Sequence, residues 1–495
     1  MEPQSGARMG SGKVGKSPME SVSDFSGLAS DSRDVKPGYL FAALNGSRAN
    51  GAAFMSDAVK RGAVAVLARP EARGDAEALG VRFIPDENPR LRLARLAAKF
   101  FGIQPKTVAA VTGTNGKTSV SVFLRQIWEQ RGFRAASMGT IGVMTPSGKI
   151  DLQHTTPDPI EVHRLLKLLA QQGVDHLALE ASSHGLDQYR LDGVEVAAAG
   201  FTNLTRDHLD YHPNVEHYLS AKLRLFKDVV RDGGVAVVNV DSDYAASFVE
   251  AATDRGLKLV TVGSEGETLR LVEHVARDDG QTLEIAFEGK TYSLELPLVG
   301  DFQASNALVA AGLAIALGDS AEKVFAALGK LHGAEGRLQK VAYAKSGAPI
   351  FVDYAHTPDA LETVLKAVRP HVRHKLHVVF GCGGDRDKGK RPLMGAAAVR
   401  LADVAIVTDD NPRSEDPAVI RKEVLVGARG ARDIGDRALA IKEAIVGLGS
   451  GDVLVIAGKG HESGQTIGTL TRPFLDKDEA VKAVLSLGGY AAETA

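Results

Sequence analysis

The run TVAAVTGTNGKTS at residues 107–119 carries three local signals in the order that a phosphate-binding loop requires. Residues 107–111 are typical of a short buried strand, and Gly113 and Gly116 allow the chain to turn. In the segment that follows, apolar side chains at 120, 123, 124 and 127 share one face of a helix. Backbone N–H groups of such a turn and the positive end of the helix both attract phosphate oxygens. The run therefore predicts a phosphate site between a strand and a helix.

Two side chains of the loop suit a nucleotide with a metal ion. Lys117 can reach the β- and γ-phosphates, and the Thr118 hydroxyl can coordinate Mg²⁺. The standard P-loop pattern places glycine where this chain has Val111, so a glycine turn without a ligand is the structural alternative. The loop alone also leaves the class of protein open, because an ATP-dependent ligase, a kinase and a regulatory nucleotide-binding module can all use one. We assign the ATP phosphates to Gly113, Thr114, Asn115, Gly116, Lys117, Thr118 and Ser119.

Length and composition exclude several other classes. The 495 residues suggest about three domains at roughly 100–200 residues each. A formal net charge of −2 gives no basic field for nucleic acid. Cys382 is the only cysteine, which excludes an internal disulfide and a thiolate zinc cluster and fits a reducing compartment. There is no run of about 18 apolar residues, so we expect no membrane insertion.

The order of strand and helix signals predicts an α/β fold with parallel sheets. We expect a flexible N-terminal segment at 1–24 without a secretory signal, a smaller α/β domain at 25–103, a central domain at 104–335 and a C-terminal domain at 336–495. Further strand-then-loop units begin at 376–380, 404–408 and 453–457. Since ligands bind beyond the carboxyl ends of parallel strands, the segments that follow these strands are candidate sites.

Several of these segments resemble one family. The loop GTNGKT at 113–118 resembles the ATP loop of the Mur ligases and of the folylpolyglutamate synthases. Similar matches to Mur ligases of the MurE type are DSRDVKPG at 31–38, HTTPD at 154–158, SSHGLDQYR at 182–190, the stretch at 202–212 that ends in DHLDYH, GCGGDRDKGKR at 381–391, DNPR at 410–413 and GKGHE at 458–462. The resemblance covers the chain from about residue 30 to its end, and the motifs together are specific.

The resemblance implies a fold and a reaction. It implies an N-terminal uridine-nucleotide domain, a central P-loop-type ATPase and a C-terminal Rossmann-like domain. The implied enzyme is a cytoplasmic, ADP-forming ligase of peptidoglycan precursor synthesis, and hence of cell wall biogenesis, cell shape and cell division. It would add meso-diaminopimelate to the D-glutamate of UDP-N-acetylmuramoyl-L-alanyl-D-glutamate. ATP would first convert the free γ-carboxylate into an acyl phosphate, which the amine then attacks. We expect a monomer.

Mg²⁺ is the implied cofactor, with Thr118, Glu180, His208 and Lys222 as its candidate ligands. Glu180 follows an apolar run at 176–179, so it stands at the carboxyl end of a predicted strand, although it could instead cap the next helix. His208 taken alone would be a structural histidine, and Lys222 an exposed helix lysine. By resemblance, Lys222 matches a lysine that carbon dioxide carbamylates, which turns a cation into an anion able to support a metal. We assign Lys117, His208 and Lys222 to catalysis.

The resemblance also implies binding residues. Asn306, Arg337, Asp353 and His356 match nucleotide contacts, and Arg337 marks a hinge between domains. A distal carboxylate on the incoming amino acid calls for a guanidinium, which Arg386 and Arg413 can supply, and Glu462 can hold an ammonium. We expect diaminopimelate at Arg386, Asp410, Asn411, Pro412, Arg413, Gly458 and Glu462. We expect the UDP-sugar dipeptide at Ser30, Ser32, Ser47, Arg48, Ala49, His154, Thr155, Thr156, Ser182, Gln188 and Arg190.

The chain departs from the family pattern at two places, and two alternative enzyme functions remain. The N-terminal domain begins with an unfamiliar stretch, and Asn50 stands where the family often has aspartate, so the chain departs from the family pattern near the uridine contacts. Within the superfamily the nearest alternative adds glutamate to folate. An enzyme that selects lysine would not need Arg413, since lysine lacks the distal carboxylate.

Overall fold

The computed structural model describes residues 24–46, 50–208 and 210–492. The segment expected to be flexible therefore lies outside the described residues except for Asp24, and so do the candidate uridine contacts Ser47, Arg48 and Ala49. The chain divides into two compact units, Met1–Gly102 and Ile103–Ala495. The expected division at residue 103 lies beside this one, and the expected division at residue 335 lies within the second unit.

The first unit is a small α/β fold built on a four-stranded, wholly parallel sheet. Its longest helix, α3, begins after Asn88, whose side chain accepts a hydrogen bond from the N–H of Leu91, and it ends at Gly102 in the left-handed conformation. The apolar face of the sheet packs into one core around Phe41, Val66 and Met55. The elements are β1 (Gly27–Ala29), β2 (Tyr39–Ala42), α1 (Met55–Lys60), β3 (Ala65–Ala68), α2 (Arg73–Ala78), β4 (Arg82–Pro85) and α3 (Pro89–Phe101).

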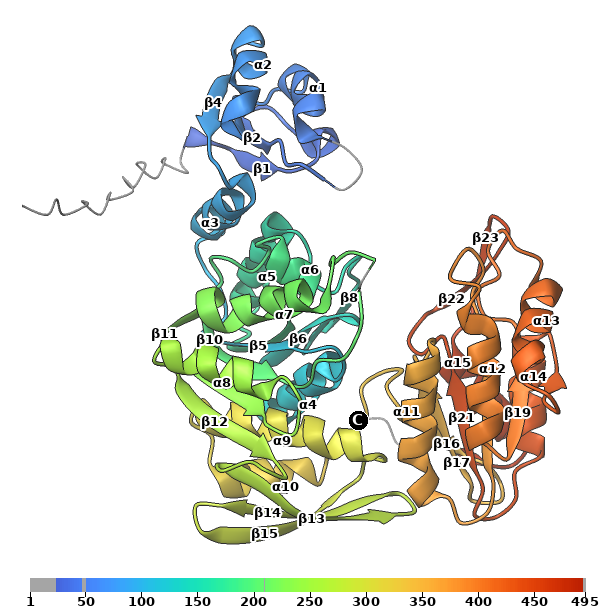
Figure 1. Cartoon of the computed structure of the whole chain (residues 1–495). Helices are drawn as coiled ribbons and strands as arrows, with labels where there is room; N and C mark the ends of the chain where they lie inside the picture. The colour runs from blue at the N-terminus through green and yellow to red at the C-terminus, as the bar shows by residue number, and fades with distance from the viewer. Residues whose placement is uncertain (1–23, 47–49, 209, 493–495) are drawn as a thin grey trace, which may run out of the picture. The chain divides into compact units, whose positions relative to one another are not determined.

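The second unit begins with an eleven-stranded sheet in the order β15-β14-β13-β12-β11-β10-β5-β9-β6-β7-β8 (Figure 1). The strands from β6 through β13 pair in parallel, and antiparallel strands extend both ends. Its strands are β5 (Thr107–Thr112), β6 (Ala135–Gly139), β7 (Gly142–Thr145), β8 (Gly148–Ile150), β9 (His176–Glu180), β10 (Val196–Phe201), β11 (Val230–Asn239), β12 (Lys258–Gly263), β13 (Leu269–Arg277), β14 (Gly280–Phe287) and β15 (Lys290–Leu296). Its helices are α4 (Lys117–Gln130), α5 (Pro159–Gln171), α6 (Ser183–Asp187), α7 (Val215–Arg224), α8 (Ala245–Asp254), α9 (Asp301–Ala316) and α10 (Ala321–Leu328).

Strand β5 lies in the middle of this sheet and contributes to a separate core on each face. Ala109 and Val111 pack with α4, α9 and α10. Val108 and Ala110 pack with α5, α7 and α8 on the opposite face. A strand buried on both faces is expected to be a continuous apolar run, as residues 108–111 are. The two layers of helices fix the end of β5, and therefore the loop that follows it.

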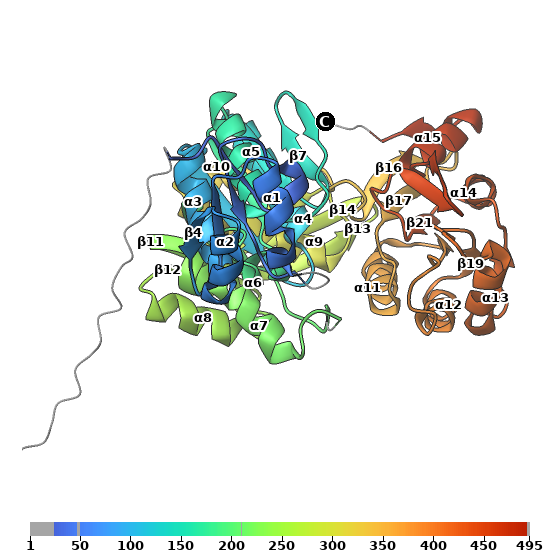
Figure 2. The same ribbon diagram turned by 90° about the horizontal axis from the view of Figure 1, so that it is seen from above.

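A seven-stranded sheet in the order β20-β19-β18-β21-β17-β16-β24 forms the rest of the second unit. Helices α11, α12 and α13 cover one face and α14 and α15 the other (Figure 2). The strands are β16 (Gln339–Tyr343), β17 (Pro349–Asp353), β18 (Leu376–Phe380), β19 (Val404–Val407), β20 (Arg432–Asp433), β21 (Val453–Ala457) and β24 (Tyr490–Ala491), with a separate hairpin of β22 (Gly464–Ile467) and β23 (Leu470–Pro473). The helices are α11 (Pro358–Val368), α12 (Lys390–Leu401), α13 (Pro417–Gly427), α14 (Arg437–Val446) and α15 (Asp476–Ser486).

The predicted fold class is confirmed, since all three large sheets are rich in parallel pairs and are packed against helices. The three strands expected in the C-terminal part are β18, β19 and β21, which are neighbours and parallel. The antiparallel extension β13–β15 was not anticipated. No helix in the part of the chain that the structure describes is long and apolar enough to cross a membrane.

Candidate active site

Polar side chains pack closely against the loop between β5 and α4. Gly113 and Gly116 have φ values of 152° and 86°. A Cβ at Gly113 would overlap Oγ1 of Thr202, and a Cβ at Gly116 would overlap Oδ1 of Asn306. Glycine is required at both positions because space and backbone conformation each exclude a side chain.

The end of β10 braces the same loop through hydrogen bonds. The Thr202 hydroxyl donates to the carbonyl of Asn115 over 2.6 Å. Oδ1 of Asn203 accepts from the N–H of Asn115 over 3.0 Å, and the N–H of Thr114 donates to the carbonyl of Asn203 over 2.8 Å. Two adjacent strands of the sheet thus hold the loop in one conformation, which is the preorganisation that a phosphate site needs.

Two lysines converge on the loop from different helices. Nζ of Lys117 donates to the carbonyls of Gly113 and Thr114 over 2.9 and 2.7 Å. Nζ of Lys222 on α7 donates to the same Gly113 carbonyl over 2.6 Å and lies 4.4 Å from the ring centre of Tyr218. Lys222 is only 1% exposed, so it is not the exposed helix lysine that its position in an isolated helix would predict.

Burial lowers the pKa of the Lys222 amine well below its usual value, and the nearby positive charge of Lys117 lowers it further. Burial also lowers the pKa of Lys117, although the Glu180 carboxylate opposes that shift. A buried amine with a lowered pKa spends more of its time neutral at neutral pH, and the neutral amine is the form that reacts with carbon dioxide. The environment of Lys222 therefore fits the carbamylation implied by the resemblance.

Glu180 is buried at the carboxyl end of β9, where its two oxygens accept hydrogen bonds from the N–H and the hydroxyl of Thr140 over 2.8 and 3.0 Å. The helix α6 that follows is capped by Ser182, whose hydroxyl oxygen accepts from the N–H of Gly185, so Glu180 is not a helix cap. Thr140, in the turn between β6 and β7, was not identified from the sequence. Its signal in the sequence is weak, because the strand β6 before it reads AASMG, which is not a continuous apolar run.

His208 has a φ of 53°, in the left-handed region that is uncommon for residues other than glycine, although histidine, asparagine and aspartate adopt it more often than most. Burial lowers the pKa of its imidazole, with Asp207 acting in the opposite direction and Lys117 and Lys222 adding to the effect. An imidazole kept neutral is the form that coordinates a metal.

The side chains near the loop offer some of the ligands that Mg²⁺ uses in proteins. Among the described residues, no three His, Cys, Asp or Glu side chains are close enough together to form a metal cluster. Mg²⁺ is usually held by one or two carboxylates together with substrate phosphates and water, so such a cluster is not required. Thr118, which is buried in the first turn of α4, together with Glu180 and His208, offers a hydroxyl, a carboxylate and an imidazole near the loop.

The other nucleotide candidates surround the segment that follows α10. Asn306 is buried on α9 beside Gly116, and Gln303 of the same helix donates to the carbonyl of Arg337 over 3.2 Å. Asp353 at the end of β17 accepts from the N–H groups of Leu338 and Ala355 over 2.6 and 2.7 Å. Both of its oxygens are thus used to hold the backbone next to Arg337.

The guanidinium of Arg337 lies 4.9 Å from the ring centre of Tyr354, and His356 Nδ1 is 2.8 Å from the Tyr354 carbonyl. Arg337 and His356 are therefore both placed around Tyr354, a residue that was not predicted from the sequence.

The dipeptide candidates of the central sheet form one hydrogen-bonded group. The Thr156 hydroxyl donates to the Glu180 carbonyl over 2.9 Å, and its oxygen accepts from the hydroxyl of Ser182 over 3.0 Å. Arg190 donates to the carbonyl of Thr156 and to the side chain of Gln188 over 2.7 and 2.9 Å. The hydroxyl of Thr155 is 3.1 Å from that of Thr140, and His154 is exposed. Of the candidates in the first unit, Ser30 is exposed and Ser32 is buried.

The amino-acid candidates lie on three loops at the carboxyl ends of β18, β19 and β21. Asp410 and Asn411 are buried in the loop that follows β19. Arg413 has a φ of 53°, and its Nη1 donates to the carbonyl of Gly384 over 2.8 Å. Pro412 is buried, Arg386 is exposed, Gly458 has a φ of 116° with Asp410 close by, and Glu462 accepts from Asn411 over 2.8 Å.

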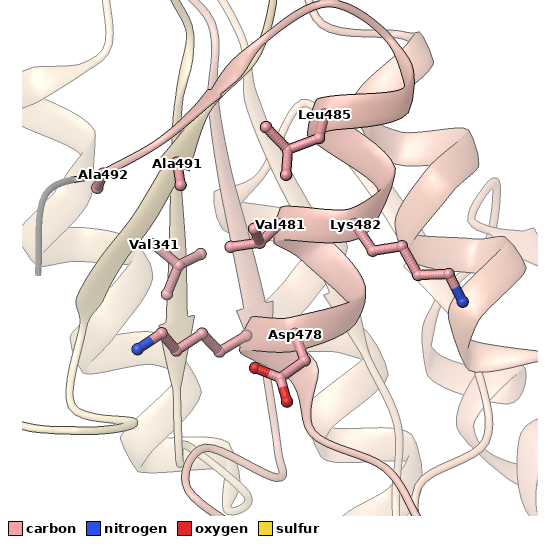
Figure 3. A pocket seen from close by; sticks show the side chains of 8 residues that line it. Val341, Asp478, Val481, Lys482, Leu485, Ala491 and Ala492 are labelled. Carbon is pink, nitrogen blue, oxygen red and sulfur yellow. The ribbon is translucent and has the colours of Figure 1, made fainter.

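A surface hollow lies away from all of these groups. It lies between α15, the edge strand β24 and the neighbouring strand β16, and is lined by Val341, Val481, Leu485 and Ala491 together with Lys477, Asp478, Lys482 and Ala492 (Figure 3). None of the site residues predicted from the sequence lines it, and the side chains around it are mainly apolar. The predicted site residues thus lie at strand ends and not in this hollow.

Three family models match the chain. The Mur ligase family catalytic domain matches residues 24–101, the Mur ligase middle domain matches 111–314, and the Mur ligase glutamate ligase domain matches 336–460. Together they cover most of its length, and the chain belongs to the Mur ligase family.

Individual relatives are similar over nearly the whole chain. A UDP-N-acetylmuramoyl-L-alanyl-D-glutamate–2,6-diaminopimelate ligase from Bradyrhizobium diazoefficiens is 54% identical over 95% of this chain and 96% of its own. One of the same name from Caulobacter vibrioides is 53% identical over 92% and 95%. A solved structure with that name has a TM-score of 0.71 at 36% identity and covers 93% of this chain and 95% of its own. A folylpolyglutamate synthase from Mycobacterium tuberculosis, at 17% identity, covers 74% of this chain and 92% of its own with a TM-score of 0.60, and shares the fold alone.

Replacing Gly116 with alanine tests whether the loop has room for a side chain at this position. Gly116→Ala should abolish nucleotide turnover in a folded protein, because the new methyl group displaces Asn306 and the loop N–H groups. Gly132→Ala is a matched control, since Gly132 also has a φ of 86° but nothing lies within 4 Å of its Cβ position. The control should cost only about 1–2 kcal/mol of stability. Steady-state ADP release and thermal unfolding measure both effects. Equal activity of the two variants would contradict the steric argument.

Proposed function

We propose that this chain is an ATP-dependent, ADP-forming ligase that adds meso-diaminopimelate to the D-glutamate of UDP-N-acetylmuramoyl-L-alanyl-D-glutamate. The observation that carries the proposal is its 54% identity, over 95% of its length, to a ligase of that name. The reaction belongs to peptidoglycan precursor synthesis, and so to cell wall biogenesis, cell shape and cell division. We expect the enzyme in the cytoplasm, because ATP and a UDP-sugar are cytoplasmic substrates. We also expect a monomer.

The reaction proceeds in two steps. An oxygen of the D-glutamate γ-carboxylate attacks the γ-phosphorus of ATP, which forms an acyl phosphate and releases ADP. The amine nitrogen of diaminopimelate then attacks the acyl carbon, and the tetrahedral intermediate expels phosphate as the amine loses its proton. Both reactants of the first step are anions, so their approach requires fixed positive charge and oriented N–H groups.

The β5–α4 loop suits the first step. Its backbone N–H groups stand at the start of α4, where the helix dipole favours phosphate, and Lys117, the first residue of α4, donates to the Gly113 carbonyl of the loop. Thr118, Glu180, His208 and carbamylated Lys222 would hold Mg²⁺, which would neutralise charge on the phosphates. Asn306, Arg337, Asp353 and His356 would complete the nucleotide site. Closing the site to water protects the acyl phosphate from hydrolysis.

The strand-end loops of the seven-stranded sheet suit the incoming amino acid, meso-diaminopimelate. Arg386 and Arg413 can bind the distal carboxylate, and Glu462 can bind an ammonium group, with Asp410, Asn411, Pro412 and Gly458 around them. The dipeptide would bind at Thr155, Thr156, Ser182, Gln188 and Arg190 with His154, and its uridine end at Ser30, Ser32 and residues 47–49. These assignments follow the resemblance and the grouping of the residues at strand ends.

An assay of ADP release tests the function. Release should require the UDP-muramoyl dipeptide and meso-diaminopimelate together, with a product heavier by the amino acid minus water. Turnover with folate and glutamate would instead favour the glutamate-adding relatives. Release without any amino acid, together with a phosphorylated product, would favour a kinase. Full activity with lysine in place of meso-diaminopimelate would reopen the lysine-adding alternative.

The proposed carbamate is tested at Lys222. Lys222→Ala should lose at least a hundredfold in turnover, about 2.7 kcal/mol of transition-state stabilisation, because it removes an anion next to the metal. Short carboxylic acids should restore part of the rate by replacing the carbamate. Lys227→Ala, which removes an exposed lysine just beyond α7, is the control and should remain active. An active Lys222→Ala enzyme, with no mass increase of 44 Da on the wild type at high bicarbonate, would exclude the carbamate.

The choice of amino acid is tested at Arg413. Charge-assisted hydrogen bonds contribute about 1.5–3 kcal/mol each, so Arg413→Ala should raise the KM for meso-diaminopimelate roughly ten- to a hundredfold. The KM values for ATP and the dipeptide should change much less. The exposed Arg472 on β23 provides the control, and Arg472→Ala should leave all three constants within about twofold. A uniform rise in the three constants would indicate general damage, and no rise for meso-diaminopimelate would exclude Arg413 as the selector.

A further inference from the structure

Lys459 is a buried side chain that joins the loops of the amino-acid site. It lies in the GKGHE segment after β21 and is 0% exposed. Its Nζ donates to the carbonyl of Gly464 at the start of β22 over 2.6 Å. The same nitrogen is 3.3 Å from Oδ1 of Asn411 and 3.4 Å from Oε2 of Glu462. One group thus contacts the loop after β19, the loop after β21 and the β22–β23 hairpin.

The hydrogen-bonding capacity of Lys459 is used up by these partners. A protonated amine has three N–H donors, and three acceptors surround it. Because it is also buried, Lys459 does not reach a ligand in the site. Any effect it has on the reaction must pass through Asn411, Glu462 and the hairpin, which makes it a positioning residue.

The side chain of Asn411 is held in one orientation by the same network. Its Oδ1 accepts from the N–H of Thr466 over 2.9 Å as well as from Lys459. Its Nδ2 donates to Oε2 of Glu462 over 2.8 Å. If the amide were rotated by 180°, Nδ2 would face the donors of Thr466 and Lys459, and Oδ1 would face the Glu462 carboxylate.

Glu462 is left with one oxygen for a ligand. Oε2 is occupied by Asn411 and Lys459, whereas Oε1 accepts no hydrogen bond within the described residues. The side chain is 33% exposed, so the carboxylate is open to an incoming group. A carboxylate with one fixed and one available oxygen is preorganised for an ammonium, since its side-chain entropy is already lost before binding.

We propose that Lys459 is a positioning residue that sets Glu462 and Asn411, as one unit, for the ammonium group of the incoming diamino acid. The inference rests on the proposed function, because it takes the amino-acid substrate from there. It adds a selectivity role for a buried group that touches no substrate. Support of the β22–β23 hairpin alone, through Gly464, is the competing explanation.

The first test replaces Lys459 with methionine, which keeps the length and removes the charge and the donors. Lys459→Met should raise the KM for meso-diaminopimelate at least tenfold, whereas the KM for ATP and for the UDP-muramoyl dipeptide should stay within about twofold. Lys459→Gln, which keeps a shorter donor, should lie between the wild type and Lys459→Met. If Lys459 only supports the hairpin, the melting temperature should fall and all three constants should change together, which would overturn the proposal.

A matched control is available in the same sheet. His377 is a buried basic side chain 3.3 Å from the Asp452 carboxylate, and it stands at the amino ends of the strands, away from the site. His377→Gln should lower the melting temperature without a selective change in the KM for meso-diaminopimelate. A selective change in this control as large as that of Lys459→Met would show that any buried defect has the effect, and the proposal would fail.

A double-mutant cycle with Glu462→Gln tests whether Lys459 acts through Glu462. If it does, Lys459→Met should change the KM for meso-diaminopimelate less than about threefold in the Glu462→Gln background, because interacting residues are not additive. A full tenfold effect in both backgrounds would overturn the proposal. Wild-type enzyme that releases no ADP with meso-diaminopimelate would instead refute the proposed function, so the two failures are distinguishable. If Lys459→Met does not fold, the double-mutant cycle with Glu462→Gln is measured with Lys459→Gln instead.

Discussion

The close packing around the turn from β5 to α4 is the constraint on which the nucleotide site depends. Thr202 and Asn306 approach the loop so closely that residues 113 and 116 cannot carry a Cβ. Two separate helical layers and the two neighbouring strands, β10 and β9, fix the end of β5. The rigidity of this loop therefore comes from the core of the whole sheet and not from the loop itself. Because the loop N–H groups are fixed before a ligand arrives, they need little reorganisation when charge develops on phosphate.

In the seven-stranded sheet, loops at the carboxyl ends of parallel strands are likewise held in place by the residues around them. Loops after three parallel strands meet at one edge, and buried cationic side chains tie them together. Arg437 on α14 pairs with Asp476 on α15 and donates to the carbonyl of Ala457, directly before Gly458. Lys459 ties the next residues to the loop after β19. Removing one member of such a buried group leaves a charge or donor unpaired, which costs more than the net contribution of the pair.

Most of the fold could be predicted from local patterns. The apolar runs at 107–111, 376–380 and 453–457 correspond to strands, and the face formed by Val120, Phe123, Leu124 and Ile127 is buried on α4. The family resemblance was confirmed by matches over most of the chain. The long antiparallel extension of the central sheet was missed, because β13 and β15 are largely exposed and mix charged with apolar residues, which weakens their pattern.

The sequence by itself determined the phosphate loop, the order of strands and helices, and the motifs after each strand, because these depend on residues that are close along the chain. The tertiary structure alone decided which groups became neighbours. It buried Lys222 against Gly113, 109 residues away, placed Thr140 on Glu180, and joined Asn411, Lys459 and Glu462. Burial and distance determine whether a lysine is a solvated cation, a reactive amine or a fixed support. Both are properties of the packed chain, which local periodicity does not encode.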